Sequence, residues 1–470
     1  MPGERADLWR GDVPLFTARP DGRTVRTSSG EELVDLLDRP GAGAAAAGPA
    51  ALTALDRDAQ EWFISAFLAC RRSEVGHRPE RGPASPRRRL RQVEPEQLLT
   101  AARGVADELI SRSVVAGGRV NWNGVEPLGD RCWVVSAQGA GLGYGYTGTA
   151  LFLAALGEVS GVDRYREVAH AAVRPLPALL SALADDGSLL AGVGGGAFSG
   201  LGGVAYAVLR LADLLDDAEI GSWLPAAVEL AARAGSSPAG AGGCGIANGG
   251  AGALAALAAV SGATGAAAAG RAVEQLGPAV AGTGPLPAGF AVGADGVDWA
   301  LRRGGVARDV LAGPGLAAGS RPADDDISWC RGAAGIVLAR LTEPQEAVPA
   351  DERLVRTLLD AGPVRDLSPC HGETGVLEAL AVLGAAGHAE AAAACTSRTA
   401  ALLETLRAGP PHCGSPRGVV TPGLLNGLAG IGHALLRIGF ADRVPSALVL
   451  GTRTSSRRST APPPRAGASG

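Results

Sequence analysis

The chain has 470 residues, which is enough for one large domain with a sizeable core and a smaller piece. Its formal net charge is −4 at pH 7, and its arginine runs, at 87–89 and 457–458, lie in stretches rich in proline, serine and glycine. Proteins that bind nucleic acid usually carry a clustered basic face, so we expect no nucleic-acid partner.

The N-terminal residues and the longest uncharged stretch argue against export and membrane insertion. Charged residues interrupt the first 20 residues, and no apolar run typical of a signal peptide follows them. The longest window without a charge, residues 234–270, is dominated by glycine and alanine, which disfavours a spanning helix. We therefore expect a cytoplasmic protein with no membrane span.

Composition divides the chain into four expected parts. Residues 1–74 form a short N-terminal piece, in which apolar residues at helical spacing predict a helix over 56–72. Residues 75–93 are rich in proline and arginine and are expected to be a linker. Residues 94–450 have the pattern of one helix after another, and residues 451–470 are expected to be a disordered tail. The sequence therefore predicts an all-α protein.

A Gly-x-x-Gly pair precedes an apolar, helix-like run six times within the helical part. The first glycines of these pairs are Gly145, Gly200, Gly249, Gly332, Gly372 and Gly427. They are separated by 55, 49, 83, 40 and 55 residues, so each interval can hold two helices, and the longest predicts an insertion over 285–308. Glycine lets the backbone approach a neighbour closely where a helix begins. The pattern predicts an α/α toroid of six helical hairpins, a double ring of helices with the glycine turns at one end.

Two of the seven cysteines stand at matching positions of consecutive repeats. Cys330 and Cys370 each lie two residues before the first glycine, and His371 follows Cys370 directly. A single cysteine is more often a small buried apolar residue than a ligand, but two thiols and an imidazole at one end of a barrel suit Zn²⁺. Three protein ligands leave a fourth position open, as in catalytic zinc sites. We predict a zinc site on these three residues.

The residues that flank the predicted ligands are expected to form a pocket. Gly332 and Gly372 follow the ligand segments, and Trp329 precedes Cys330. The tryptophan either lines this pocket or belongs to the core. The remaining cysteines, which are scattered along the chain and not expected to be ligands, are Cys70, Cys132, Cys244, Cys395 and Cys413.

These residues also carry a family resemblance. The Trp-Cys-x-Gly-x-x-Gly at 329–335 and the Cys-His-Gly at 370–372 resemble the zinc signature of the lanthionine cyclases, the lanthionine synthetase C-like family. The glycine pairs are similar to those of that family's α/α toroid, and the resemblance covers residues 95–450. Segments similar to class II lanthipeptide synthetases (LanM type) occur at 8–16, 198–203, 421–424 and 444–446. The resemblance implies the C-terminal cyclase part of such a synthetase, with residues 1–74 as the remnant of the end of a dehydratase domain.

The resemblance implies a Michael addition in lanthipeptide biosynthesis. A cysteine thiol of a dehydrated precursor peptide would bind Zn²⁺ at the open position, lose its proton and attack the β-carbon of dehydroalanine or dehydrobutyrine. Protonation of the resulting enolate would give lanthionine or methyllanthionine. The implied partners are the dehydrated precursor and a separate dehydratase that supplies it.

The sequence departs from the family pattern at the residues that move protons. Where the family usually has a histidine in the third repeat, this chain has Asn248, which cannot exchange a proton near neutral pH. The usual acid before the first glycine pair is also absent, and Asp326 stands where some members have an arginine. Candidate substitutes for the acid or base are Tyr144, Tyr146 and His412. The alternative to an active cyclase is a zinc-binding pseudoenzyme that holds the peptide or scaffolds a dehydratase.

Overall fold

The computed structural model describes most of the chain in two compact units. The described residues are 7, 15–51, 54–71, 93–129, 132–236, 243–282, 286–306, 325–342 and 351–453. The expected linker (except its last residue), most of the expected tail and segment 8–14 therefore lie outside them. The units span Met1–Ser65 and Ala66–Gly470.

The N-terminal unit contains a small sheet that the sequence did not predict. Strands β1 (Phe16–Ala18), β2 (Val25–Thr27) and β3 (Glu32–Leu33) pair antiparallel in that order. Strands of two or three residues are too short to show the alternation that marks a strand, so the sequence predicted only the helical part of this piece. Helix α2 (Gly41–Ala51) follows, and α3 (Ala54–Cys70) confirms the helix predicted over 56–72.

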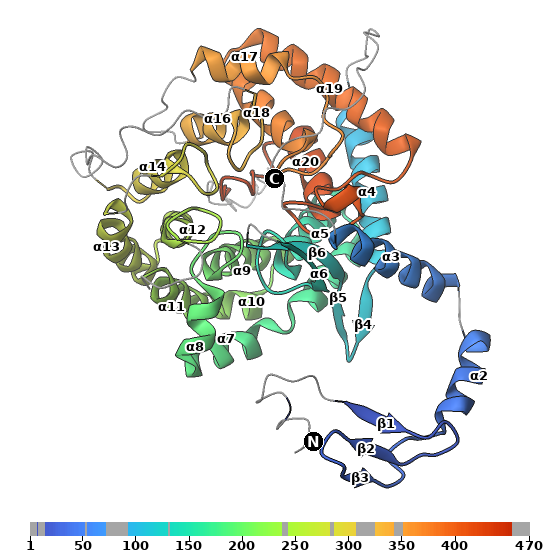
Figure 1. The fold of residues 1–470 in the computed structure, drawn as a ribbon. Helices are drawn as coiled ribbons and strands as arrows, with labels where there is room; N and C mark the ends of the chain where they lie inside the picture. Colours follow the sequence, from blue (N-terminus) through green and yellow to red (C-terminus); the bar gives the residue numbers. More distant parts are fainter. Residues whose placement is uncertain are drawn as a thin grey trace, which may run out of the picture. The chain divides into compact units, whose positions relative to one another are not determined.

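The second unit is built on a closed ring of inner helices (Figure 1). Each inner helix packs on the next and the last packs on the first; they are α5 (Tyr146–Ser160), α9 (Leu201–Leu215), α12 (Gly250–Thr264), α14 (Ala294–Arg303), α16 (Ala333–Leu341), α18 (Glu373–Ala385) and α20 (Leu428–Gly439). Helices packed outside them include α4 (Pro95–Ser111), α6 (Asp163–Val173), α11 (Leu224–Gly235), α13 (Ala267–Ala281), α17 (Glu352–Asp360) and α19 (Ala389–Ala408). The predicted all-α toroid is confirmed.

Burial differs between the two rings as the sequence pattern requires. The inner helix α12 is rich in alanine and glycine and buries residues on nearly every face, which lets its neighbours approach closely. The outer helix α17 is amphipathic and buries only Leu354, Val355 and Leu358. The remaining short helices, α7 (Leu176–Asp185), α8 (Gly187–Val193) and α10 (Ala218–Ser222), connect outer helices to inner ones.

The structure adds a seventh glycine turn to the six that were predicted. Gly293 and Gly296 begin α14, and Gly293 has the same extended backbone as the first glycine of the other turns. The expected insertion over 285–308 is therefore wrong, because that stretch holds an inner helix of the ring. It was missed because Asp298, Arg302 and Arg303 make α14 less apolar than its neighbours.

Steric contact explains the second glycine of all seven described turns. A Cβ there would lie only 1.8–2.2 Å from the carbonyl oxygen of the residue six positions earlier, so no other residue fits. Backbone hydrogen bonds also join one turn to the next around the ring. Their donor and acceptor pairs are Gly143 to Phe198, Phe198 to Ala247, Ala247 to Ala291, Ala291 to Cys330, Trp329 to Cys370, Cys370 to Leu425 and Leu425 to Gly143.

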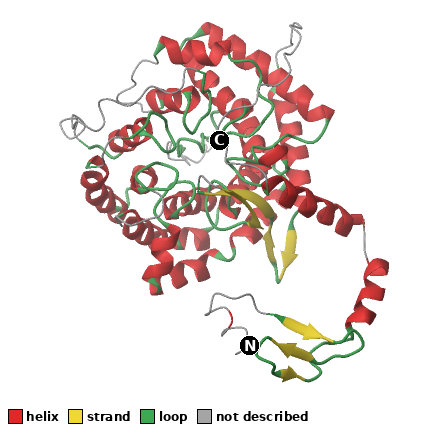
Figure 2. Ribbon diagram, viewed as in Figure 1, coloured by secondary structure: helices red, strands yellow, loops and turns green. Residues whose placement is uncertain are grey.

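Two hairpins interrupt the helices of the second unit (Figure 2). Strands β4 (Val114–Ala116) and β5 (Arg119–Asn121) form the first, and β6 (Asn123–Leu128) and β7 (Cys132–Ala137) form the second. The first turns through Gly117 and Gly118, whose φ angles are +57° and +71°. A Gly-Gly pair between short strands is a recognised hairpin signal, although the sequence pattern was not used to predict this hairpin.

The C-terminal segment 444–453 is bound by inner helices. Tyr206 Oη and Arg210 Nη1 donate to the Gly451 carbonyl at 2.7 and 2.8 Å, and Arg303 donates to the carbonyls of Val449 and Leu450. These three side chains lie 6 or 10 residues after the first glycine of their turns. At 1.5 Å per residue the contacts lie about 9–15 Å along the helices, away from the glycine turns.

Among the described residues, no single helix combines the length and apolar composition needed to cross a membrane. Only the bent pair Asp163–Asp185 and Gly187–Val193 passes that test, and only when the two parts are taken together.

Candidate metal centre

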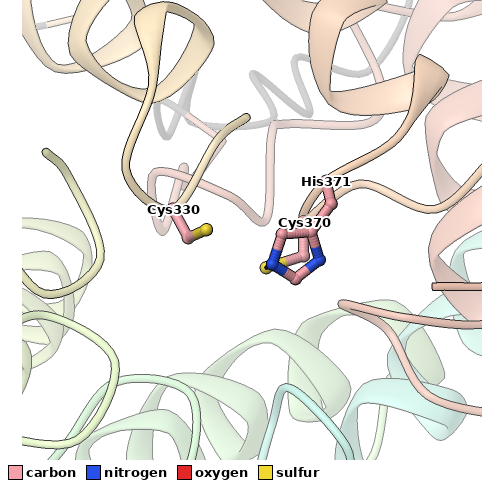
Figure 3. Close-up of side chains that lie close together, drawn as sticks. All are labelled: Cys330, Cys370 and His371. Atoms are coloured by element: carbon pink, nitrogen blue, oxygen red, sulfur yellow. Dashed lines mark hydrogen bonds between the residues drawn. The ribbon is translucent and has the colours of Figure 1, made fainter. Parts of the chain in front are cut away.

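Cys330, Cys370 and His371 converge at the mouth of the ring, on the glycine-turn side (Figure 3). The two cysteines occupy the same position in the consecutive turns that begin α16 and α18, and the Trp329 amide donates to the Cys370 carbonyl at 3.0 Å. The two Sγ atoms and an imidazole nitrogen all lie within 4.8 Å of one another, and all three side chains are buried. The repeat thus places the predicted ligands together.

The geometry of this cluster fits a tetrahedral zinc site. Bonds of about 2.3 Å to sulfur and 2.0 Å to nitrogen, at a tetrahedral angle, place a sulfur and a nitrogen ligand about 3.5 Å apart. The observed distance between Cys370 Sγ and His371 Nε2 is 3.7 Å. A donor set of two sulfurs and one nitrogen also favours Zn²⁺ over the oxygen-preferring Mg²⁺ and Ca²⁺.

The two cysteines share the same local support. Each follows an Asp-x-Ser, and the aspartate Oδ1 accepts the serine amide, at 2.8 Å for Asp326 and Ser328 and at 2.7 Å for Asp366 and Ser368. Ser328 Oγ also lies 3.5 Å from Cys330 Sγ. These contacts fix the turn that aims each thiol, and the repeated Asp-x-Ser-x-Cys-x-Gly pattern was present in the sequence but was not used to predict them.

Without a bound cation, the charges in the cluster favour the protonated forms of Cys370 and His371. A hydrogen bond with Cys330, then burial, then the charges of Cys330, Asp366 and Asp326 raise the pKa of Cys370 well above its usual value. Burial alone would lower the pKa of His371, but the negative charge of Cys330 and its hydrogen bond, with the two aspartates, raise it overall. A divalent cation would offset this concentration of negative charge and displace the protons.

A buried ion pair holds the segment that carries Cys370 and His371. Arg398 Nε and Nη2 donate to the two carboxylate oxygens of Glu373 at 2.7 Å each, and Glu373 follows Gly372 at the start of α18. Arg398 also donates to the carbonyls of Ala361 and Gly362, and the Val364 amide donates to Glu373 at 2.9 Å. One arginine on outer helix α19 therefore clamps both ends of the ligand segment.

Comparison with known proteins gives the chain a family. The family model described as "Lanthionine synthetase C-like protein" matches residues 136–277 and 309–449, which is more than half of the chain. This chain belongs to the lanthionine synthetase C-like family. A solved structure titled "Nisin cyclase" is similar at 16% identity with a TM-score of 0.44, and the match covers 66% of this chain and 92% of that chain. No curated protein matches the sequence.

In this lanthionine synthetase C-like protein, the expected proton-transfer residues lie in different surroundings. Tyr144 is half-buried, and burial, followed by the charges of Cys370, Cys330 and Glu126, raises its pKa well above 10. Asn248 is exposed to solvent on the third turn. The cluster of ligand atoms thus draws only on the fifth and sixth of the seven turns, and Asn248 is not part of it.

The other predicted site residues support the turns of the protein. Trp329 is 1% exposed and packs edge-on against Phe198 and Phe290, with ring centroids 4.9 and 5.4 Å away, so it lies in the core behind Cys330. Gly332 and Gly372 are extended N-caps, where a Cβ would meet the Asp326 or Asp366 carbonyl oxygen at 2.3 or 2.4 Å.

The candidate substitutes and remaining cysteines lie outside the cluster. Burial raises the pKa of Tyr146, at the start of α5, to about 12, and His412 is half-buried next to Gly418. Within the described ranges, only Cys330, Cys370 and His371 form a group suited to a metal ion. Cys413 is also buried, but it is not in that group.

Proposed function

We propose that this chain is a zinc-dependent lanthionine cyclase, with Cys330, Cys370 and His371 as the zinc ligands. The observation that carries the proposal is the convergence of two thiols and one imidazole within 4.8 Å of one another, with a sulfur–nitrogen distance of 3.7 Å between Cys370 and His371. Membership of the lanthionine synthetase C-like family supports a peptide substrate and a cyclase reaction.

The proposed reaction joins a cysteine thiol to a dehydroamino acid of the same precursor peptide. Zn²⁺ bound by the three ligands would supply Lewis acidity, which lowers the pKa of a thiol at the open fourth position. A sulfur–carbon bond forms at the β-carbon of dehydroalanine or dehydrobutyrine, and a proton is added at the α-carbon. The product has the mass of the substrate, because the thiol proton lost is balanced by the proton gained.

Two residues of the chain are proposed to act on the enolate. Tyr144, whose phenol stays protonated at neutral pH, is proposed as the proton donor to the α-carbon. Asn248 replaces the expected histidine and cannot exchange a proton, but its exposed amide can donate a hydrogen bond to an oxygen that gains negative charge. A general acid or base typically contributes about 10²–10⁴-fold, so we expect slow cyclisation.

The test is incubation of the zinc-loaded chain with a dehydrated precursor peptide. Cyclisation removes alkylatable thiol from the peptide without changing its mass, and both quantities are read by mass spectrometry after alkylation. Cys330→Ala and the metal-free chain are the controls, and both should be inactive. Unchanged thiol content with the zinc-loaded wild type would contradict cyclase activity.

The second candidate function is a zinc-binding pseudoenzyme that holds the peptide or scaffolds a dehydratase. The loss of the usual histidine at Asn248 favours it. Asn248→His separates the two functions: a large rate gain indicates a weakened cyclase, whereas peptide binding with no ring formation in either form indicates a scaffold. Peptide affinity is measured in the same samples by fluorescence anisotropy.

We also propose that the substrate arrives already dehydrated by a separate dehydratase of class II type, and that residues 1–74 correspond to the end of such a domain. The test is a mixing experiment in which an unmodified precursor and a dehydratase are supplied together or singly. Ring formation that requires both proteins would support this arrangement. Rings formed from unmodified precursor by this chain alone would contradict it.

A further inference from the structure

The two candidate ligands Cys330 and Cys370 differ in the contact that each makes with its nearest serine. Each cysteine lies two residues after a fully buried serine, which is Ser328 in one turn and Ser368 in the other. Cys330 Sγ donates to Ser328 Oγ at 3.5 Å. Ser368 Oγ instead donates to Asp366 Oδ2 at 3.0 Å, and among the described residues no hydrogen bond joins it to Cys370. Two turns with the same sequence pattern therefore give their thiols different surroundings.

A second contact orients the hydroxyl group of Ser328. The Arg331 backbone amide donates to Ser328 Oγ at 3.3 Å, so the serine oxygen already accepts a hydrogen bond. A hydroxyl has one proton to donate. Within the described ranges the partners of this hydroxyl are the Arg331 amide and Cys330 Sγ, and only the sulfur can accept a proton. When Cys330 binds a metal as a thiolate it has no proton of its own, so the direction of this hydrogen bond reverses and the hydroxyl donates to the sulfur.

The backbone amides that follow Cys330 are engaged with other acceptors. Amides at the start of a helix are common donors to an anion. Here the Gly332 amide donates to the Ser328 carbonyl at 3.0 Å, and the Ala333 amide donates to the Asp326 carbonyl at 2.8 Å. The Arg331 amide is taken by the serine hydroxyl. The Ser328 hydroxyl is therefore the donor that this turn offers to the sulfur.

Burial strengthens the contact between Ser328 and Cys330. Their exposed fractions are 1% and 4%, so solvent has little access to either side chain. A hydrogen bond to an ionised group is stronger than one between neutral groups, and a surrounding of low polarity strengthens it further. A buried thiolate that loses this donor has little water to replace it.

We propose that Ser328 is a positioning residue of the metal centre, whose hydroxyl donates to the metal-bound Cys330 thiolate. This inference rests on the proposed zinc site and deepens it. The donated hydrogen bond draws negative charge from Cys330 Sγ, so this ligand gives less electron density to the metal. The metal then remains a stronger Lewis acid toward a substrate thiol. Cys370 has no such hydroxyl donor among the described residues, so the two thiolates are unequal.

The first test is spectroscopic and needs no turnover. Co²⁺ is loaded in place of Zn²⁺, and the thiolate-to-cobalt absorption is recorded for the wild type, Ser328→Ala and Ser368→Ala. We expect the band of Ser328→Ala to move to longer wavelength, because a thiolate without a hydrogen bond gives up an electron more easily. Ser368→Ala is the matched control and should keep the wild-type band, because its hydroxyl donates to Asp366 and not to a thiol.

The second test separates the hydroxyl from packing and folding. Ser328→Thr and Ser328→Val add side chains of similar size and shape, but only threonine keeps the hydroxyl. We expect Ser328→Thr to retain the wild-type band and Ser328→Val to show the band of Ser328→Ala. Chelator competition should give a metal affinity about 10–100-fold lower in Ser328→Val than in Ser328→Thr, as is typical of a lost partner of a metal ligand. This pair decides the role of the hydroxyl even where Ser328→Ala is too unstable to load.

The outcomes distinguish this inference from the proposed function. A wild-type chain that shows no thiolate-to-cobalt absorption would overturn the proposed metal centre and the role of Ser328 with it. A wild-type band that keeps its position in Ser328→Ala and Ser328→Val would overturn only the role of Ser328, as would equal shifts in Ser328→Ala and Ser368→Ala. A shift confined to the variants without the Ser328 hydroxyl supports the inference, and it does so even if the wild-type chain forms no rings in the peptide assay.

Discussion

Arg398 and Glu373 form a two-point ion pair behind the candidate metal ligands, with side chains only 8% and 4% exposed. The pair joins outer helix α19 to the first residue of inner helix α18, two residues after His371. Because of this position, the packing of an outer helix on an inner helix helps to orient the side chains of the candidate ligands.

Replacing Arg398 with methionine should both destabilise the fold and weaken metal binding. It leaves the buried Glu373 carboxylate without a positively charged partner, which typically costs about 3–5 kcal/mol. It also releases the ligand segment, which typically costs about 10–100-fold in metal affinity. Urea unfolding and chelator competition measure the two effects. Arg356→Met removes exposed ion pairs with Glu352 and Glu390 and should cost only about 1 kcal/mol or less. Equal effects of the two substitutions on stability and metal affinity would contradict the role of Arg398 in holding the ligand segment.

Zinc binding should release protons and weaken as the pH falls. The pKa of Cys370 is raised, so in the metal-free protein its thiol is protonated at pH 7, and a metal that binds the thiolate must displace that proton. Each displaced proton lowers the apparent affinity about tenfold per unit decrease in pH. Calorimetry in two buffers of different ionisation enthalpy counts the protons.

The control for this titration is Cys413→Ser, because burial raises the pKa of that thiol to about 12 although it lies outside the ligand cluster. The number of protons released should not change in this variant, whereas Cys370→Ser should release fewer. Zinc affinity that is constant between pH 6 and 8 would show that the ligands are not protonated thiols.

Two glycine-to-alanine substitutions should change the free energy of unfolding in opposite directions. A Cβ on Gly296 would lie 1.8 Å from the Phe290 carbonyl oxygen, so the turn must shift, and we expect a loss of about 3 kcal/mol or more. Gly262 is exposed inside α12 with nothing within 4 Å of its Cβ direction, so alanine there should add about 0.5–1 kcal/mol. Thermal unfolding compares them, and a tolerated Gly296→Ala would mean that the turn is not sterically fixed.

Truncation should distinguish the bound C-terminal segment from the residues after it. Ending the chain at Arg443 removes four large buried apolar side chains, Val444, Leu448, Val449 and Leu450. At about 1.5–3 kcal/mol each, this loss approaches the whole stability of a typical domain, so we expect no cooperative unfolding transition. Ending at Arg453 keeps every described contact of the segment and should leave the melting temperature unchanged. A stable chain ending at Arg443 would show that the segment is dispensable.

The metal ligands and the toroid could be predicted because short repeated sequence motifs indicate both. Cys330 and Cys370 each lie two residues before the first glycine of their turns. Because consecutive turns are neighbours in the ring, residues at the same position of these turns lie close together. The seventh turn was missed because charged residues on α14 obscure its apolar face, and the N-terminal sheet was missed because its strands have only two or three residues. The Arg398–Glu373 clamp joins positions 25 residues apart on different helices, and no local pattern marks such a pair.

The hydrogen bond from Leu425 to Gly143 sets an order of events during synthesis. It closes the ring between residues 282 positions apart, so an emerging chain cannot complete the circle until Leu425 has left the ribosome. The entropic cost of so long a closure grows only slowly with length, but the wait is set by translation. The Leu425 carbonyl also accepts a hydrogen bond from the Cys370 amide. The turn that carries Cys370 and His371 therefore lacks this contact until Leu425 has been synthesised. Nascent chains should therefore be unable to capture metal tightly until Leu425 has emerged, which delays thiol chemistry until the barrel is whole.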